Sequence, residues 1–486
     1  MLSAADGRCR ATQAAQVCAA CKTRKKKNRL SCRYGTVVAP NKQERRAPAF
    51  SQPFFVLPGL SLSQSSLLEP ATTLCLQVHR VIRDSGLQLD EATTQYFQGL
   101  HRYLPFISRA HFEQDVSIVE STPPAGRSAL NLSLCLINAS SRLSLHGKSG
   151  SSSRVPDRRH LYLVTKSLFA QIQVVFPPSI SLLQACVLLA VYEYSEGEPD
   201  QAFVSITGCI RMAHRLRIHL HSRTFPQPAK DLNMSLGTNL HPYAHAKEAF
   251  NTWWAIVIYE RLSFSELTVA EQPLLTVVPD TQAQLPVESR ASEGVDHAPK
   301  LSLESSLEVS DSGSLLIGPF GRIAQAIWIL DQVLSSFKTS ELDMRLTAIA
   351  GLHTKIQELL ALLLQQGQSQ VVVLCEAIAV TLRVSFTFYL HILDWPAVTP
   401  AVGLHSIRGW QECARVTLNT ATNIVLDIVD VHDGPHGISR IYTPPSYPYL
   451  VRAALRYVER SKQQSGDGFL KNASQRLRGT LDRLHE

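Results

Sequence analysis

Cysteines with the spacing of metal ligands lie near the start of the sequence. Cys18 and Cys21 are separated by two residues, and Cys9 and Cys32 lie on either side of them. Two thiolates at this spacing can bind one tetrahedral metal ion from a tight turn, and Zn²⁺ favours thiolate ligands. Five of the six residues that follow Cys21 are Lys or Arg. A bound zinc ion would hold these cations on a short ordered element, which suits recognition of a phosphate backbone.

The positive charge of the chain is concentrated around these cysteines. Residues 1–46 hold 12 Lys or Arg and two acidic residues, a net charge of +10, whereas the rest of the chain holds 36 basic and 38 acidic residues. Such asymmetry indicates a basic arm for an anionic partner, attached to a nearly neutral body. We expect double-stranded DNA as this partner, with most contacts to phosphates and one or two to guanine edges. The contacting cations would be Lys22, Arg24, Lys25, Lys26, Lys27 and Arg29.

The stretch from Cys18 to Lys27 resembles the opening of the six-cysteine binuclear zinc cluster of fungal transcription factors. Cys32, followed by Arg33 and Tyr34, resembles the last cysteine of that cluster and its tail. In that family six thiolates hold two zinc ions, and a short basic helix enters the major groove. The resemblance implies Zn²⁺ as the cofactor and sequence-specific DNA binding as the function.

The middle of the family pattern is missing. Asn28 stands where the third cysteine is expected, and the fourth and fifth cysteines have no counterpart. One interpretation is a complete cluster interrupted in a mis-joined or variant transcript, and a second is a degenerate cluster. A third is a single zinc site, whose four ligands would be Cys9, Cys18, Cys21 and Cys32. A fourth is a solvated basic tail that acts as a nuclear import signal.

The composition predicts three parts. Residues 1–46 form the basic module, residues 47–70 are rich in Pro and Ser and indicate a linker, and residues 71–486 show helical periodicity. We find no sustained heptads after the basic module and no convincing β-sheet pattern, so the expected fold is all-α. The acidic, Ser-rich stretch 288–314 interrupts the pattern and predicts a surface loop or disordered insert. After it we expect helices over Phe320–Phe337, Leu346–Gln365, Val371–Leu393, Ile407–Val429 and Tyr449–Ser461.

Three patches of the body resemble the regulatory domain of the same fungal family. The first, Tyr96–Phe112, has aromatic and aliphatic residues that we expect to anchor a helix end and the following loop. The second is the apolar stretch Ser181–Tyr192, predicted to be a buried helix, followed by a helical hairpin up to His219. We expect Asp200 to cap the second helix of that hairpin. Arg217 stands where the family has Gly, which weakens the expected left-handed stop of this helix.

The third patch is a predicted helix over Phe250–Arg261 with an aromatic stripe. Trp253 and Trp254 are expected to pack in the core rather than to form a ligand cage. Glu260 and Arg261 match an acidic residue and an arginine of the family, and we expect them to form a structural pair. The three patches together place an effector- or partner-responsive regulatory domain over most of residues 90–460.

Several function classes find no support in the sequence. It has no Gly-rich phosphate loop, no paired-histidine metalloprotease motif and no nucleophile elbow, so we do not expect an enzyme. His214, His219 and His221 cluster at one predicted helix end without an acidic partner nearby, which is more typical of helix-end contacts than of a metal site. No stretch resembles a signal peptide, and the longest apolar runs are too short or too interrupted to span a bilayer.

The sequence therefore predicts a nuclear, zinc-cluster-type DNA-binding regulator of transcription by RNA polymerase II. Expected partners besides DNA are the transcription machinery or co-regulators, with a small-molecule effector as a further possibility and no membrane. The alternative is a partner-binding regulator whose degenerate cluster no longer binds DNA specifically. An enzyme built on the helical body is the weakest of the three hypotheses.

Overall fold

The computed structural model describes the helical body of the chain. The described residues belong to one compact unit, Leu67–Glu486, and they are 70–117, 124–145, 157–222, 240–268, 272–278, 283–288, 308–309, 314, 317–338, 342–395, 401–433, 443–462 and 468–485. The predicted basic module, and all of the predicted linker except Pro70, lie outside them.

The described residues confirm the predicted all-α class. They contain no strand, and the only β-type pairing among them is an isolated bridge between Gln284 and Glu308. Two short 3-10 helices, η1 (Leu100–Arg102) and η2 (Ile218–Ser222), accompany the α-helices. In chain order the α-helices are α2 (Pro70–Asp84), α3 (Leu89–Gln98), α4 (Arg109–Ser117), α5 (Ala125–Leu145), α6 (Arg158–Val175), α7 (Ile180–Ser195), α8 (Pro199–Arg215), α9 (Leu240–Phe264), α10 (Pro319–Ser336), α11 (Leu342–Leu393), α12 (Ala401–Asp433), α13 (Tyr447–Lys462) and α14 (Gly468–His485).

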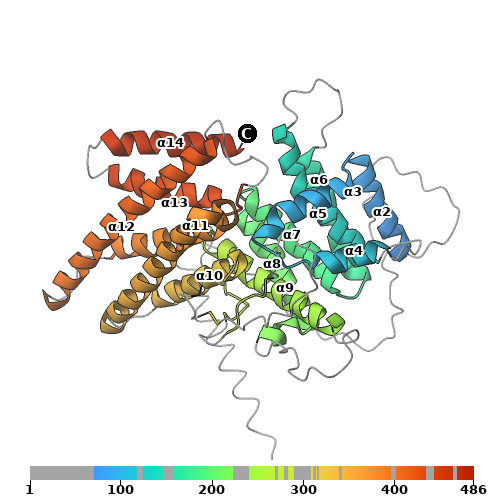
Figure 1. Cartoon of the computed structure of the whole chain (residues 1–486), viewed down its shortest axis with the longest axis horizontal. Helices are drawn as coiled ribbons and strands as arrows, with labels where there is room; N and C mark the ends of the chain where they lie inside the picture. Colours follow the sequence, from blue (N-terminus) through green and yellow to red (C-terminus); the bar gives the residue numbers. More distant parts are fainter. Residues whose placement is uncertain are drawn as a thin grey trace, which may run out of the picture. The chain divides into compact units, whose positions relative to one another are not determined.

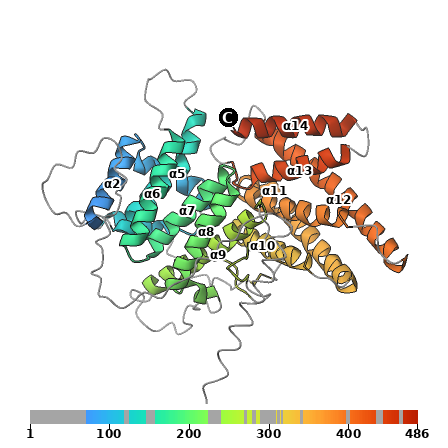
Figure 2. The same ribbon diagram turned by 180° about the vertical axis from the view of Figure 1, so that it is seen from behind.

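The helices pack mainly against neighbours in the sequence, in two groups. Helix α5 packs on α2, α3, α6 and α7, and α7 packs on α8 and α9. In the second group α10 packs on α11, α11 on α12 and α13, and α13 on α14. Helix α10 also packs on α9, so these two helices join the groups, and both views show them in the middle of the body (Figures 1 and 2).

Helix α7 confirms the prediction of a buried helix from its apolar sequence. Every residue from Leu182 to Tyr194 is buried, because α5, α8 and α9 pack around it. Ser179 caps its N-terminus by accepting a hydrogen bond from the backbone N–H of Leu182 at 3.2 Å. At its C-terminus Gly197 adopts a left-handed φ of +85°, and the N–H of Glu198 donates to the carbonyl of Glu193. This is the Schellman arrangement that favours glycine.

Helix α8 begins and ends differently from the prediction. Glu198 is its N-cap and Pro199 its first residue, so Asp200 lies inside the first turn and is not the cap. The side chain of Asp200 instead accepts a hydrogen bond from the hydroxyl of Thr268. After the helix, Arg217 takes a φ of +59°. The chain therefore makes the left-handed stop with an arginine, at the steric cost that glycine avoids.

The second group of helices differs from the sequence prediction at α11. Two helices were expected, Leu346–Gln365 and Val371–Leu393, whereas the structure has one helix of 52 residues that contains both. Residues 366–370 are polar or glycine, but they contain no proline and so do not break the backbone hydrogen bonding of the helix. Helix α14 was not among the predicted helices.

Helix α11 also contains an apolar stretch whose length is that of a membrane span. Val373–Leu393 is long and apolar enough to cross a membrane by length and composition alone, whereas the apolar run at its start was expected to be too short or too interrupted. However, 72% of its most apolar window is buried inside the protein. Burial of this extent is typical of a core helix.

Of the predicted insert 288–314 the structure describes Glu288, Glu308, Val309 and Ser314. Val309 is buried at 3% exposure, and its N–H donates to the carbonyl of Ala283 at 2.8 Å. The carbonyl of Ser314 accepts a hydrogen bond from the Arg322 guanidinium of α10. These described positions contact the core.

Candidate functional site

The residues that the sequence assigned to zinc and DNA lie outside the described residues. These are Cys9, Cys18, Cys21 and Cys32 for the metal, and the six cations from Lys22 to Arg29 for DNA. Their roles stay predictions. The candidate site that the structure does describe lies in the body, where the loop before α4 meets α9.

Polar side chains of α7 and α9 hold the loop Pro105–Ser108 in place. Gln184 of α7 donates its amide to the carbonyl of Phe106 at 3.0 Å, and Asn251 of α9 donates to the carbonyl of Pro105 at 3.1 Å. Gln184 and Asn251 are buried, at 2% and 3% exposure. The backbone groups of a buried loop need such partners because water cannot reach them. The aromatic and aliphatic residues that were predicted to anchor this helix end and loop are buried, with Tyr96, Phe106 and Ile107 at 0%, 0% and 2% exposure.

Glu248 of α9 connects this loop to two histidines. Its Oε1 atom accepts hydrogen bonds from the backbone N–H of Ser108 and from the amide of Gln184, both at 2.9 Å. Its Oε2 atom lies 2.7 Å from Nδ1 of His111, at the start of α4. Because a carboxylate only accepts hydrogen bonds, Nδ1 of His111 carries the proton.

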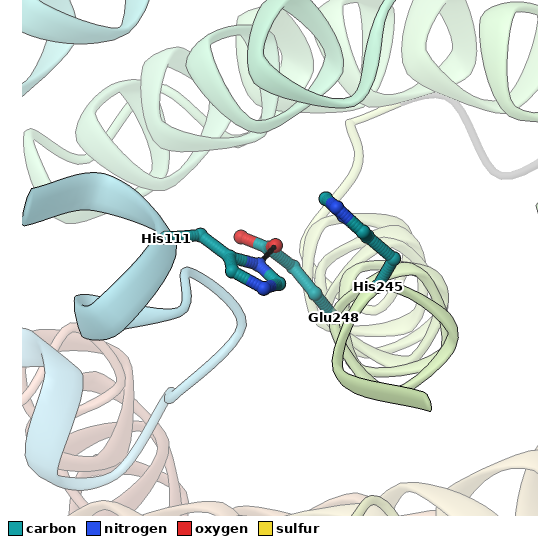
Figure 3. Close-up of side chains that lie close together, drawn as sticks. All are labelled: His111, His245 and Glu248. Atoms are coloured by element: carbon teal, nitrogen blue, oxygen red, sulfur yellow. Dashed lines mark hydrogen bonds and ion pairs between the residues drawn. The ribbon is translucent and has the colours of Figure 1, made fainter. Parts of the chain in front are cut away.

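His245 completes a cluster of three potential metal ligands (Figure 3). The rings of His111 and His245 lie 4.3 Å apart between centroids, inclined by 25°. One ligand atom of each of His111, His245 and Glu248 lies within 4.8 Å of those of the other two, and no second group of three His, Cys, Asp or Glu meets this condition among the described residues. We call these three residues the His–His–Glu cluster.

The environment of the cluster ranges from buried to exposed. The side chains of His111 and Glu248 are 14% and 9% exposed, whereas His245 is an exposed residue.

Burial also shifts the pKa values of two residues that precede the loop. Burial lowers the pKa of His101 to about 4, assisted by the positive charge of Arg109. Burial, together with the charge of Glu248, raises the pKa of Tyr96 well above its usual value. Burial therefore keeps His101 and Tyr96 neutral at physiological pH.

Sequence reasoning missed the His–His–Glu cluster. The one local signal is the three-residue spacing of His245 and Glu248, which places both on one face of a helix. His111 precedes Glu248 by 137 residues, so only the tertiary structure brings them together.

The pair Glu260 and Arg261 is confirmed as a buried structural pair. Arg261 donates to Glu260, to the carbonyl of Thr276 at 2.7 Å and to Asp331 of α10 at 2.8 Å. Glu260 also accepts from the backbone N–H groups of Leu275 and Thr276. Both members of the pair are fully buried, at 0% and 1% exposure. The pair ties the segment after α9 to α9 and α10.

Trp253 and Trp254 are core residues, as predicted, at 4% and 1% exposure. The rings of His214 and His219 lie 4.3 Å apart, and each lies about 6 Å from the ring of Trp253. The side chain of His221 is outside the described residues. Within the described residues no carboxylate or thiol joins His214 and His219 to form a group of three ligands.

A second buried polar group joins the two sets of helices. Arg383 of α11 donates to the hydroxyl of Tyr194 of α7, and to Ser265 and Glu266 just after α9. Tyr449 of α13 stacks on Tyr194 at 4.3 Å and donates its hydroxyl to the Tyr194 carbonyl at 2.7 Å. Two hollows among the described residues, one lined by Arg383 and the other by Trp395, each have an empty volume of about 180 Å³. Neither is a ready-made pocket for a small molecule.

Comparison with known proteins identifies the family. The profile of the fungal specific transcription factor domain matches residues 93–363, which is more than half of the chain and includes the His–His–Glu cluster and the Glu260–Arg261 pair. The chain therefore belongs to the fungal specific transcription factor domain family. In addition, 139 residues are 27% identical to Transcription factor BOA15 of Botryotinia fuckeliana (strain B05.10), covering 29% of this chain and 71% of that protein. The chain is a fungal transcription regulator.

Proposed function

We propose that this regulator acts in the nucleus by binding specific DNA sites through its basic N-terminal segment. The observation that carries the proposal is the net charge of +10 in residues 1–46, next to the paired thiols Cys18 and Cys21, in a chain whose body belongs to a transcription factor family. The body itself is nearly neutral and offers no comparable concentration of charge.

The donor set of the segment fits one zinc ion. Residues 1–46 contain four cysteines, Cys9, Cys18, Cys21 and Cys32, and four thiolates complete one tetrahedral site. Two tetrahedral sites need at least six thiolates even when two of them bridge, so the two-zinc cluster of the family does not fit this chain. Bound zinc would supply the folding free energy that so short and polar a segment lacks, on the order of 10–16 kcal/mol in small structural sites.

The cations of the segment provide affinity and orientation. Each phosphate that Lys or Arg neutralises contributes about −0.9 to the slope of log affinity against log salt on duplex DNA. Six contacting cations, Lys22, Arg24, Lys25, Lys26, Lys27 and Arg29, therefore give a slope of about −5. Any of them that reaches guanine O6 and N7 adds sequence discrimination of about 1–3 kcal/mol.

The helical body would set when the bound protein activates or represses transcription, through co-regulators or the transcription machinery. The Glu260–Arg261 pair and the Arg383 group join helices that are distant in the sequence, so a partner bound to one helix group can affect the other. Two hollows of about 180 Å³ among the described residues are small for a ligand site, and we favour a protein partner over a small-molecule effector. The body carries no catalytic role in this proposal.

The experiment is a DNA-binding titration of the full chain by fluorescence anisotropy over a range of salt concentrations. Replacement of Lys25, Lys26 and Lys27 with Gln should make the salt slope about 2.7 less negative. A matched control replaces three exposed cations of the body, Arg211, Arg408 and Lys471, with Gln and should leave the slope unchanged. Equal slopes in the two triple variants would reject direct contact by the basic segment.

The second candidate function is a partner-binding regulator that no longer binds DNA specifically. It is favoured by Asn28 at the expected third cysteine and by the missing fourth and fifth cysteines. It predicts that replacing Cys18 and Cys21 with Ser leaves the preference for cognate over random DNA unchanged. A longer in-frame transcript segment between the codons for Lys25 and Cys32, carrying three more cysteines, would restore the full cluster and exclude this candidate.

A further inference from the structure

The His–His–Glu cluster has the composition of a metal site, and it lies far from the cysteines in the sequence. We propose that His111, His245 and Glu248 bind a divalent transition metal ion of the Zn²⁺ type. The ion would join the start of α4 to α9, inside the fungal specific transcription factor domain. The site is independent of any zinc that the N-terminal cysteines hold.

The ligand types support this class of ion. Two imidazoles and one carboxylate are a common protein ligand set for Zn²⁺, with water in the fourth position of the tetrahedron. Mg²⁺ and Ca²⁺ prefer sites made of oxygen atoms, so two histidines disfavour them. The ligand atoms already lie within 4.8 Å of one another. Zinc at about 2.0–2.1 Å from each ligand atom places these atoms about 3.3–3.4 Å apart. Nδ1 of His111 and Oε2 of Glu248, at 2.7 Å, must therefore move apart, and ligand atoms that are up to 4.8 Å apart must come closer.

Glu248 is held in a fixed orientation for this role. Its Oε1 atom accepts from the backbone of Ser108 and from the buried amide of Gln184, so Oε2 is turned towards His111. Hydrogen bonds of this kind orient metal-binding carboxylates, and their loss typically weakens metal binding 10–100-fold. Figure 3 shows His111 and Glu248 in contact, with His245 beside them on the same helix as Glu248.

The contact between His111 and Glu248 marks the place of the ion. Nδ1 of His111 and Oε2 of Glu248 are 2.7 Å apart and share one proton. Zinc bound to Nδ1 would displace this proton, which can move to Nε2 of the same ring. Nδ1 and Oε2 then each donate an electron pair to the metal, and His245 supplies the third.

The test measures zinc binding by isothermal titration calorimetry. It uses the full chain in which Cys9, Cys18, Cys21 and Cys32 are replaced with Ser, so that the N-terminal thiolates do not contribute. We expect one zinc ion per chain. His245→Ala should weaken binding at least tenfold, and because His245 is exposed this change should leave the circular dichroism spectrum unaltered. Glu248→Gln should weaken binding as well.

His214→Ala is the matched control. His214 and His219 have the same ring separation of 4.3 Å as His111 and His245, but no carboxylate or thiol completes a group of three around them among the described residues. Zinc binding should be unchanged in this variant. Absence of zinc binding in the parent chain, or equal affinity in the His245→Ala and His214→Ala variants, would overturn the proposal. The proposed DNA contacts lie in residues 1–46, so the outcome of the DNA titration is separate.

Discussion

Removal of the Arg261 side chain should cost far more stability than the same change in an exposed ion pair. Arg261→Met deletes the hydrogen bonds to Glu260, Thr276 and Asp331 and leaves the Glu260 carboxylate at 0% exposure without its cation. Losing one partner of a buried ion pair costs about 3–5 kcal/mol, because the other charge is then buried without compensation. We expect this decrease in the free energy of unfolding, measured by urea denaturation of the full chain.

The control for this prediction is Arg415→Met. Arg415 and Glu412 form an ion pair at 2.9 Å, but their side chains are 50% and 68% exposed. Exposed pairs contribute about 0–1 kcal/mol. Should Arg261→Met fail to fold, Arg261→Lys keeps the charge and loses part of the hydrogen bonding, so a loss between those of the two methionine variants is expected. Losses that agree within about 1 kcal/mol for Arg261→Met and Arg415→Met would refute the reasoning.

Two further predictions concern the helix stop and the buried histidine. Arg217→Gly should stabilise the fold by about 0.5–1 kcal/mol, because glycine removes the left-handed strain at φ +59° but adds unfolded-state entropy. Gly197→Ala, at φ +85°, should instead decrease the free energy of unfolding, and urea denaturation measures both changes. Burial lowers the pKa of His101 to about 4, so between pH 4 and 6.5 the unfolded chain binds a proton that the folded chain does not. Stability should therefore rise with pH in this window, and His101→Phe should flatten that rise.

A different result would contradict each of these predictions. Equal stability of the parent and Arg217→Gly would show that α8 tolerates the left-handed arginine without cost. An unchanged pH dependence in His101→Phe would place the acid sensitivity of the fold on other groups. Phenylalanine keeps an aromatic ring beside Phe97, whose ring lies 4.8 Å from that of His101, so the substitution tests the proton and preserves the packing.

The helices of the body could largely be predicted from the sequence, because their apolar residues recur at helical spacing. The stretch Ser181–Tyr192 and the stripe through Trp253 and Trp254 both proved to be buried helices. The ends of helices were less predictable. Asp200 is a good capping residue, but the helix begins two residues earlier, with Glu198 as its N-cap and Pro199 as its first residue. Residues 366–370 are a weak interruption, and helical hydrogen bonding continued through them in α11.

The two candidate sites also differ in how far the sequence predicts them. The paired thiols at Cys18 and Cys21 and the basic run after them are neighbours in the sequence, so local spacing and charge were enough to predict a zinc-dependent basic segment. The pairing of Glu260 with Arg261 was expected as well, because this stretch resembles the family pattern of an acidic residue followed by an arginine. No pattern in the neighbouring sequence predicted Asp331 or Thr276 as the other partners of Arg261.

The sequence by itself determined the all-α class, the buried helices and the division between a basic segment and a neutral body, because periodicity and charge are properties of neighbouring residues. The tertiary structure alone decided which distant polar groups meet. His111 reaches Glu248 across 137 residues, and Tyr449 reaches Tyr194 across 255. Such contacts depend on how whole helices pack, and the spacing of side chains along the chain does not determine that packing.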